Sequence, residues 1–159
     1  MPLYDFTHNA SLSSQQQDDL AAAITKIHTT YFTTPSFFVN VRFTSADGYR
    51  AYVGGKRKQA NILTARVRTS PARKREMFDE LCLQVAKVWR EIVPENPDLR
   101  VFIIGGIIAG LEHGFAIPEA GKDKEWIKNN LPEFQKKADE GITEFQELIK
   151  EIKERGLID

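Results

Sequence analysis

The chain begins Met1-Pro2-Leu3-Tyr4-Asp5-Phe6, a proline followed by residues typical of a short β-strand. Cells commonly remove an initiator methionine when the next residue is small. Removal of Met1 exposes the secondary amine of Pro2 at the tip of the strand. Because an α-amino group titrates near pH 8, burial or nearby cations can make it neutral, and a neutral amine serves as a general base. Pro2 is therefore a candidate catalytic residue, although most Met-Pro starts have no such role.

Outward from this strand, a strand–helix–strand pattern occurs twice along the chain. Each unit is expected to place two parallel strands under one right-handed crossover helix. Two units side by side predict an α/β (α+β) fold, in which a four-stranded mixed sheet carries both helices on one face. A largely apolar second face would call for oligomerisation. The expected elements are strand 3–7, helix 13–31, strand 37–43, strand 61–68, a helix from Ser70-Pro71 to about Val93, and a buried strand 99–105.

The remaining segments connect or extend these units. A short strand at 49–53 and a turn at Gly54-Gly55 are expected between the units, and a turn or half-helix at 107–115 after them. Residues 123–155 carry an apolar stripe among charged residues, which predicts one or two helices interrupted near Pro132 or Gly141.

These patterns indicate a two-part organisation. Residues 2–118 form a duplicated β-α-β domain, with units at about 2–44 and 61–105. Residues 119–159 form a helical extension that packs on the same domain or on a neighbouring subunit.

Composition indicates an ordinary globular protein. The 159 residues are 42% hydrophobic and 28% charged, which fits one domain with a sizeable core. The single Cys82 excludes an internal disulfide, and its apolar helical setting predicts a buried, reduced thiol in a cytoplasmic protein. No stretch has the pattern of a membrane span or a signal peptide.

Charge is balanced overall but unevenly distributed. The chain has 22 basic and 22 acidic residues, yet nine basic residues and no acid occur from Arg50 to Arg75. This segment fits a small anionic substrate, a nucleic acid or a solvated loop. Nucleic acid is the least favoured, because Tyr52 has no neighbouring run of stacking aromatics. The histidines lie far apart in sequence and no phosphate-binding glycine motif occurs, so neither a metal nor a cofactor is expected.

The duplicated unit that starts at Pro2 resembles the tautomerase superfamily, whose members use an amino-terminal proline as the catalytic amine. The order and spacing of several segments resemble the cis-3-chloroacrylic acid dehalogenase-like group, over about Pro2 to Trp126. The segments are Ala23-Ile24-Thr25-Lys26-Ile27-His28, Phe38-Val39-Asn40-Val41-Arg42-Phe43, Val53-Gly54-Gly55 and Gly110-Leu111-Glu112-His113-Gly114. The resemblance implies a homotrimer that acts on a small carboxylate substrate without a cofactor.

The resemblance also implies site residues. Pro2 corresponds to the general acid or base, and His28 to a histidine that helps to hold the substrate carboxylate. Arg73 corresponds to the second of two carboxylate-binding arginines. The first is ambiguous: Arg68 fits if the loop is longer, whereas a gapless count reaches Ser70. An arginine suits this task because its planar fork holds a carboxylate with two hydrogen bonds.

Two positions, Glu112 and Ile103, decide which chemistry is expected. Glu112 corresponds to the acid that activates or positions water in the dehalogenases. Those enzymes also have a tyrosine in the fourth strand, where this chain has Ile103, and the segment from Gly105 to Glu112 is about two residues shorter. We therefore expect a tautomerase that acts on a small enol or 2-oxo acid. The alternatives are a hydratase or dehalogenase with Pro2 as general acid, and a non-catalytic binding protein on the same fold.

Overall fold

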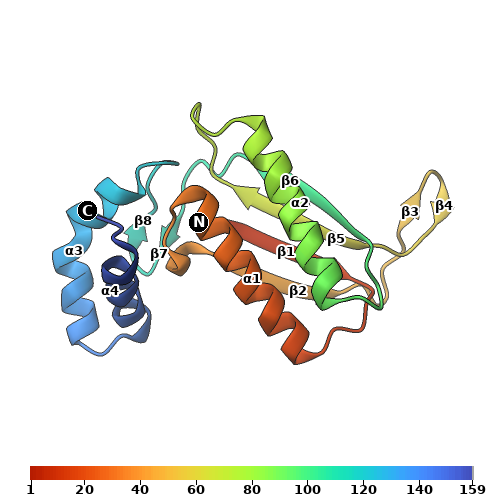
Figure 1. Cartoon of the computed structure of the whole chain (residues 1–159), viewed down its shortest axis with the longest axis horizontal. Helices are drawn as coiled ribbons and strands as arrows, with labels where there is room; N and C mark the ends of the chain where they lie inside the picture. The colour runs from red at the N-terminus through yellow and green to blue at the C-terminus, as the bar shows by residue number, and fades with distance from the viewer. Residues whose placement is uncertain (159) are drawn as a thin grey trace.

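A computed structural model describes residues 1–158 of the chain (Figure 1). Its main sheet has the strand order β2-β1-β5-β6. β1 is parallel to β2 and antiparallel to β5, and β5 is parallel to β6. The predicted four-stranded mixed sheet is therefore confirmed. The strands are β1 (Leu3–His8), β2 (Asn40–Ser45), β5 (Asn61–Val67) and β6 (Leu99–Gly105).

Helices α1 (Ser14–Phe32) and α2 (Arg75–Ile92) lie together on one face of this sheet, as Figure 1 shows. Alternate residues of β1 point toward them, because successive side chains of a strand face opposite sides. Tyr4 and Phe6 are thereby buried, and Phe6 stacks on Trp89 of α2. A capping box between Ser13 and Gln16 starts α1, which agrees with the predicted helix start.

The opposite face of the sheet is mixed rather than largely apolar. Asp5 of β1 forms ion pairs with Arg42 of β2, at 2.6 Å, and with Arg66 of β5. The apolar side chains Phe102 and Ile104 are exposed on β6. The prediction that β6 is buried was wrong: it is an edge strand, and its outer side has no neighbour within the described chain. Cys82 is likewise half-buried rather than buried, and burial raises the pKa of its thiol.

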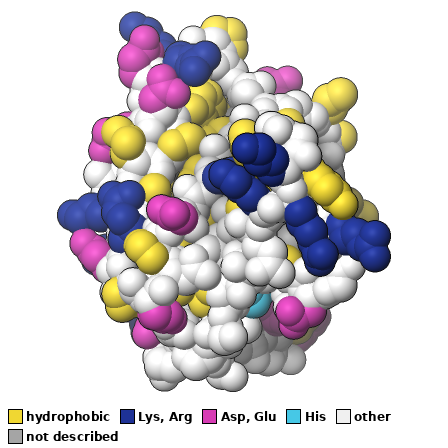
Figure 2. Space-filling view, turned by 90° about the vertical axis from the view of Figure 1, so that its right-hand side faces the viewer, with side chains coloured by type: hydrophobic (Ala, Val, Ile, Leu, Met, Phe, Trp, Pro, Cys, Tyr) yellow, Lys and Arg dark blue, Asp and Glu magenta, His cyan; other side chains and the backbone are white. Residues whose placement is uncertain are grey.

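A small hairpin of β3 (Tyr52–Val53) and β4 (Lys56–Arg57) projects from the far end of the sheet (Figure 1). Gly54 and Gly55 form its turn and both have positive φ, which glycine adopts without strain. Figure 2 looks onto this end of the molecule and shows Lys and Arg side chains at its surface. The basic segment identified in the sequence thus includes a solvent-exposed arm.

Two predicted boundaries were wrong, each for a local reason. The strand predicted at 37–43 starts at Asn40, because Pro35 leads into a short 3-10 helix, η1 (Ser36–Phe38). Helix α2 starts after Lys74 rather than at Ser70, whose carbonyl instead accepts a turn hydrogen bond from the Arg73 N–H. The segment 107–115, predicted as a turn or half-helix, contains a turn at 113–114 and no helix. Its end belongs to a hairpin of β7 (Leu111–Glu112) and β8 (Phe115–Ala116).

The C-terminal part forms α3 (Asp123–Asp139) and α4 (Thr143–Arg155). Pro132 lies inside α3 without ending it, so the interruption occurs only near Gly141, which has a positive φ. Phe134 and Phe145 are buried in a second core, against which the partly buried Phe115 of β8 packs. Within residues 1–158, no helix has the length and hydropathy of a membrane span.

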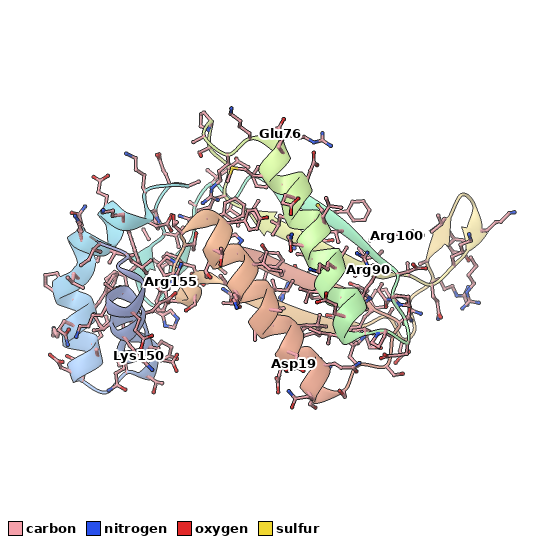
Figure 3. All side chains as sticks on the ribbon, in the orientation of Figure 1. Asp19, Glu76, Arg90, Arg100, Lys150 and Arg155 are labelled. Atoms are coloured by element: carbon pink, nitrogen blue, oxygen red, sulfur yellow. The ribbon has the colours of Figure 1, made fainter. Side chains whose placement is uncertain are left out.

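The extension is fastened to the end of α1. Arg155, labelled in Figure 3, donates hydrogen bonds to the carbonyl oxygens of Thr29 (3.0 Å) and Thr34 (3.3 Å). Glu151 of the same helix accepts a hydrogen bond from the Ser36 N–H at 3.0 Å. These contacts place the extension beside the end of the sheet at which the chain begins.

Candidate active site

The chain terminus lies where β5 ends. Leu3 pairs with Arg66 in antiparallel register, so Pro2 lies beside the residues that follow β5. The Asn40 N–H donates to the Pro2 carbonyl at 3.1 Å, and Pro2 is buried. Met1 is present in this structure, so the terminal amine is that of Met1. Removal of Met1 leaves the amine on Pro2, one residue closer to the sheet.

The surroundings of the terminal amine disfavour its protonated form. Burial, followed by the charge of Arg68, lowers the pKa of the Met1 amine to about 5, and Arg73 acts in the same direction. Glu112 and Asp123 act in the opposite direction. A terminal amine in this place is neutral at pH 7 and available as a base.

Glu112 has one carboxylate oxygen held and one free. Its Oε1 accepts a hydrogen bond from Asn40 Nδ2 at 3.0 Å. Its Oε2 is buried and has no hydrogen-bond partner among residues 1–158. Burial raises the pKa of this carboxyl. Asn40 therefore holds Glu112 by its side chain and Pro2 by its backbone, and Oε2 is left to accept from a water or a substrate.

His28 is neutral and orientated by Tyr4. Burial, followed by the charge of Arg73, lowers the pKa of His28 to about 3. Burial raises the pKa of Tyr4, which therefore keeps its proton. The Tyr4 hydroxyl and Nδ1 of His28 share a hydrogen bond at 2.7 Å. His28 is thus a neutral group near the terminal amine, orientated by its bond to Tyr4.

The two arginines have different environments. Arg68 is 4% exposed and donates to Asp123 and to the carbonyl oxygen of Pro118, each at 2.7 Å. Arg73 lies with its guanidinium 4.4 Å from the ring centre of Phe32 and donates to the Arg68 carbonyl at 2.9 Å. In the described part of the chain, no carboxylate pairs with Arg73. Arg73 is therefore the arginine with capacity for a substrate carboxylate.

An open cavity of about 420 Å³ adjoins this cluster through Arg68. The loop at 106–110 and the segment at 116–120 form its other walls, and Ser70 lies at its rim. Its volume is within the range of small-molecule sites. Of the candidate site residues, only Arg68 lines this cavity.

The structure thus brings Pro2, His28, Arg68, Arg73 and Glu112 together from separate segments. Asn40, Tyr4 and Asp123 are the contributors that sequence reasoning missed as site residues. Buried and less buried residues alternate along β1, and this pattern could have indicated that Tyr4 faces α1, the helix that carries His28. No sequence signal indicated Asp123.

Two further predictions concern the tyrosine of the fourth strand and a metal site. Ile103 packs against the core under the helices, and β6 supplies no hydroxyl at that position. Within residues 1–158, no cluster of three or more His, Cys, Asp or Glu side chains has the geometry of a metal site.

Comparison with known proteins identifies related folds. Residues 1–131 match the model of a family described as "Putative oxalocrotonate tautomerase enzyme". N1, a member of the cis-3-chloroacrylic acid dehalogenase family, is 20% identical with a TM-score of 0.73, and the match covers 87% of this chain and 99% of that chain. An Aspergillus fumigatus protein described as a probable enzyme is 21% identical with a TM-score of 0.62, over 82% of this chain and 94% of that one.

A fused 4-OT, solved as an asymmetric trimer, is 15% identical with a TM-score of 0.57 and covers 71% of this chain and 94% of its own. No curated protein sequence matches the chain.

Proposed function

Because the chain belongs to this oxalocrotonate tautomerase family, within the tautomerase superfamily, we propose that it is a cofactor-free tautomerase acting on a small enol or 2-oxo carboxylate. The observation that carries the proposal is the setting of the chain terminus, where burial and Arg68 lower the pKa of the Met1 amine to about 5. An amine in this setting is a base at neutral pH, and its neighbour Arg73 has capacity for a carboxylate.

In the proposed reaction, neutral Pro2 removes a proton from the enol oxygen. The protonated amine then delivers a proton to the carbon at the other end of the enol double bond. Arg73 binds the substrate carboxylate with charge-assisted hydrogen bonds. His28 donates from Nε2 to the oxygen on which negative charge develops, in the tautomer whose Nδ1 accepts from the Tyr4 hydroxyl. No step requires a metal or an organic cofactor.

Ketonisation of phenylenolpyruvate tests the proposal. The protein is first shown by intact mass to lack Met1, and the loss of the enol absorbance is then followed. We expect a rate well above the buffer-catalysed rate. The matched control is the same chain with Met1 retained, in which the Pro2 nitrogen is an amide without basicity. Equal rates for the two forms would exclude the terminal amine as the base.

Glu112 supports a second candidate function, the hydration or dehalogenation of small unsaturated acids with protonated Pro2 as general acid. The favouring observation is its buried Oε2, which has no hydrogen-bond partner among the described residues. In this candidate function, the oxygen accepts a proton from water. Against this candidate stands Ile103, where the related dehalogenases have a tyrosine.

Glu112→Gln separates the two functions. The amide keeps the acceptor for Asn40 but cannot take a proton from water. We expect hydration or halide release from 3-haloacrylates to fall by about 100-fold, and ketonisation to change by less than about fivefold. Halide release and enol absorbance measure the two reactions on the same preparation. Equal losses in both would show that Glu112 has no specific role with water.

The proposal includes a homotrimer in the cytoplasm, with residues 2–118 as the catalytic domain and 119–159 as its extension. The exposed Phe102 and Ile104 on the free edge of β6 support an assembly through that strand. Light scattering measures the mass in solution. A processed, folded protein that converts neither enols nor unsaturated acids would instead be a binding protein on this fold.

A further inference from the structure

Asp123 is a buried acid that the C-terminal extension brings into the site. It is the first residue of α3 and is 3% exposed. Its Oδ1 accepts from Arg68 at 2.7 Å, whereas its Oδ2 is buried without a hydrogen-bond partner among residues 1–158. A carboxylate is rarely buried to this extent unless a partner compensates its charge. Here the compensating charge is that of Arg68.

The extension also fixes the position of the Arg68 guanidinium. Besides Asp123, its Nη1 donates to the carbonyl oxygens of Pro118 (2.7 Å) and Glu119 (3.3 Å), and its Nη2 to the Thr34 hydroxyl (3.4 Å). Three of these four acceptors lie between residues 118 and 123. The guanidinium is therefore directed into the extension, away from a role as a free carboxylate ligand.

Charged and titratable groups reach the terminal amine from every surrounding element. Arg68 follows β5, Arg73 precedes α2, Glu112 lies on β7 and Asp123 begins α3, and all four act on the amine. His28 of α1 also interacts with it but is neutral. The local set is thus two cations and two carboxylates. Removal of any one of these charges shifts the balance in a known direction.

We propose that Asp123 is a positioning residue of the active site, which holds Arg68 as a buried, neutral ion pair and so keeps the charge around the terminal amine balanced. The inference rests on the proposed function only in making this amine the catalytic group. It also makes the first turn of the C-terminal extension part of the site. A merely structural role for Asp123 would not alter the titration of the amine.

The test is the titration of the terminal amine in Asp123→Asn. Asparagine keeps the oxygen that accepts from Arg68 but removes the negative charge. Loss of the Asp123 charge and the uncompensated guanidinium both disfavour the protonated amine, so we expect the amine pKa to fall by about one unit. The rate of acylation of the Pro2 amine between pH 3 and 8, read by mass spectrometry of the N-terminal peptide, measures this pKa. Lysine side chains stay protonated over that range.

Glu125→Gln is the matched control. Glu125 lies on the same helical turn but is exposed, with Lys122 at 3.7 Å, so its loss removes one charge from the surface. We expect no measurable shift of the amine pKa, because exposed charges are screened. An unchanged pKa in folded Asp123→Asn, or an equal shift in Glu125→Gln, would overturn the proposal.

Arg68→Gln should shift the amine pKa in the opposite direction. It also keeps the proposal testable if Asp123→Asn does not fold. Removal of the guanidinium leaves Asp123 as an uncompensated anion, and the amine pKa is expected to rise. Adding Asp123→Asn to Arg68→Gln removes both charges and is expected to lower the pKa again. Should Asp123→Asn alone fail to fold, the absence of this second shift would refute the proposal. Acylation needs no turnover, so the result stands whether or not the chain ketonises enols.

Discussion

Replacing Pro2 with alanine is expected to lower kcat/KM for ketonisation by about 100-fold or more, the lower end of what a positioned acid–base group contributes. The pyrrolidine ring fixes the direction of the nitrogen lone pair, whereas the primary amine of alanine rotates freely. The Asn40 N–H still meets the carbonyl of residue 2, so β1 and β2 keep their register. Steady-state kinetics on protein of confirmed mass measure the change.

Thermal unfolding and light scattering serve as controls for this variant. We expect both to match the unchanged protein, because the replaced side chain lies at the end of the sheet rather than within its aromatic core. A kcat/KM within about threefold of the unchanged value would remove Pro2 from the mechanism. It would then direct attention to Glu112 as the base.

Replacing Arg73 with alanine is expected to lower kcat/KM by about 10- to 100-fold, mainly through KM. A hydrogen bond to a charged group contributes roughly 1.5–3 kcal/mol, and Arg73 forms no ion pair within the described chain that would compete for the substrate. Arg73→Lys should recover only part of the loss, because an ammonium group lacks the bidentate fork. Arg75→Ala is the matched control, since Arg75 is largely exposed and, among residues 1–158, pairs with Asp79.

Arg73→Ala also has an expected effect on the pH profile. Arg73 helps to lower the pKa of the terminal amine, so its removal allows the protonated form to persist to higher pH. The acidic limb of the pH profile of kcat/KM, which reports the pKa of the base in the free enzyme, should therefore shift to higher pH. An unchanged KM together with an unchanged limb would show that Arg73 contacts neither the substrate nor the amine.

Local patterns predicted the sheet and its two helices well. The alternation in β5 and the helical spacing of Leu20 and Ile24 reflect burial on one face, which repeats with the period of each element. Boundaries were less predictable where one hydrogen bond decided between two conformations. Ser70-Pro71 resembles a helix start, but the Ser70 carbonyl closes a turn instead, and the helix begins only after Lys74.

The candidate site was predictable only in part. Pro2 was a candidate from the start of the chain and Glu112 was found through resemblance, but their proximity depends on long-range packing that no local pattern encodes. Arg68 and Arg73 were both assigned to the substrate carboxylate, Arg68 with Ser70 as its alternative. Their difference arises because Asp123, more than fifty positions further along the chain, pairs with one of them. Distant pairing of this kind is set by tertiary structure alone.

Under the proposed mechanism, the chain that retains Met1 resembles a zymogen. With Met1 in place, the Pro2 nitrogen is part of a peptide bond, and the geometry around it is already complete. Activity then requires no refolding, only removal of one residue by an aminopeptidase, and Met1 remains partly exposed to such an enzyme. The specific activity of any preparation should therefore follow its degree of processing, and an affinity tag fused to the N-terminus should silence the protein, whereas one fused to the C-terminus should not.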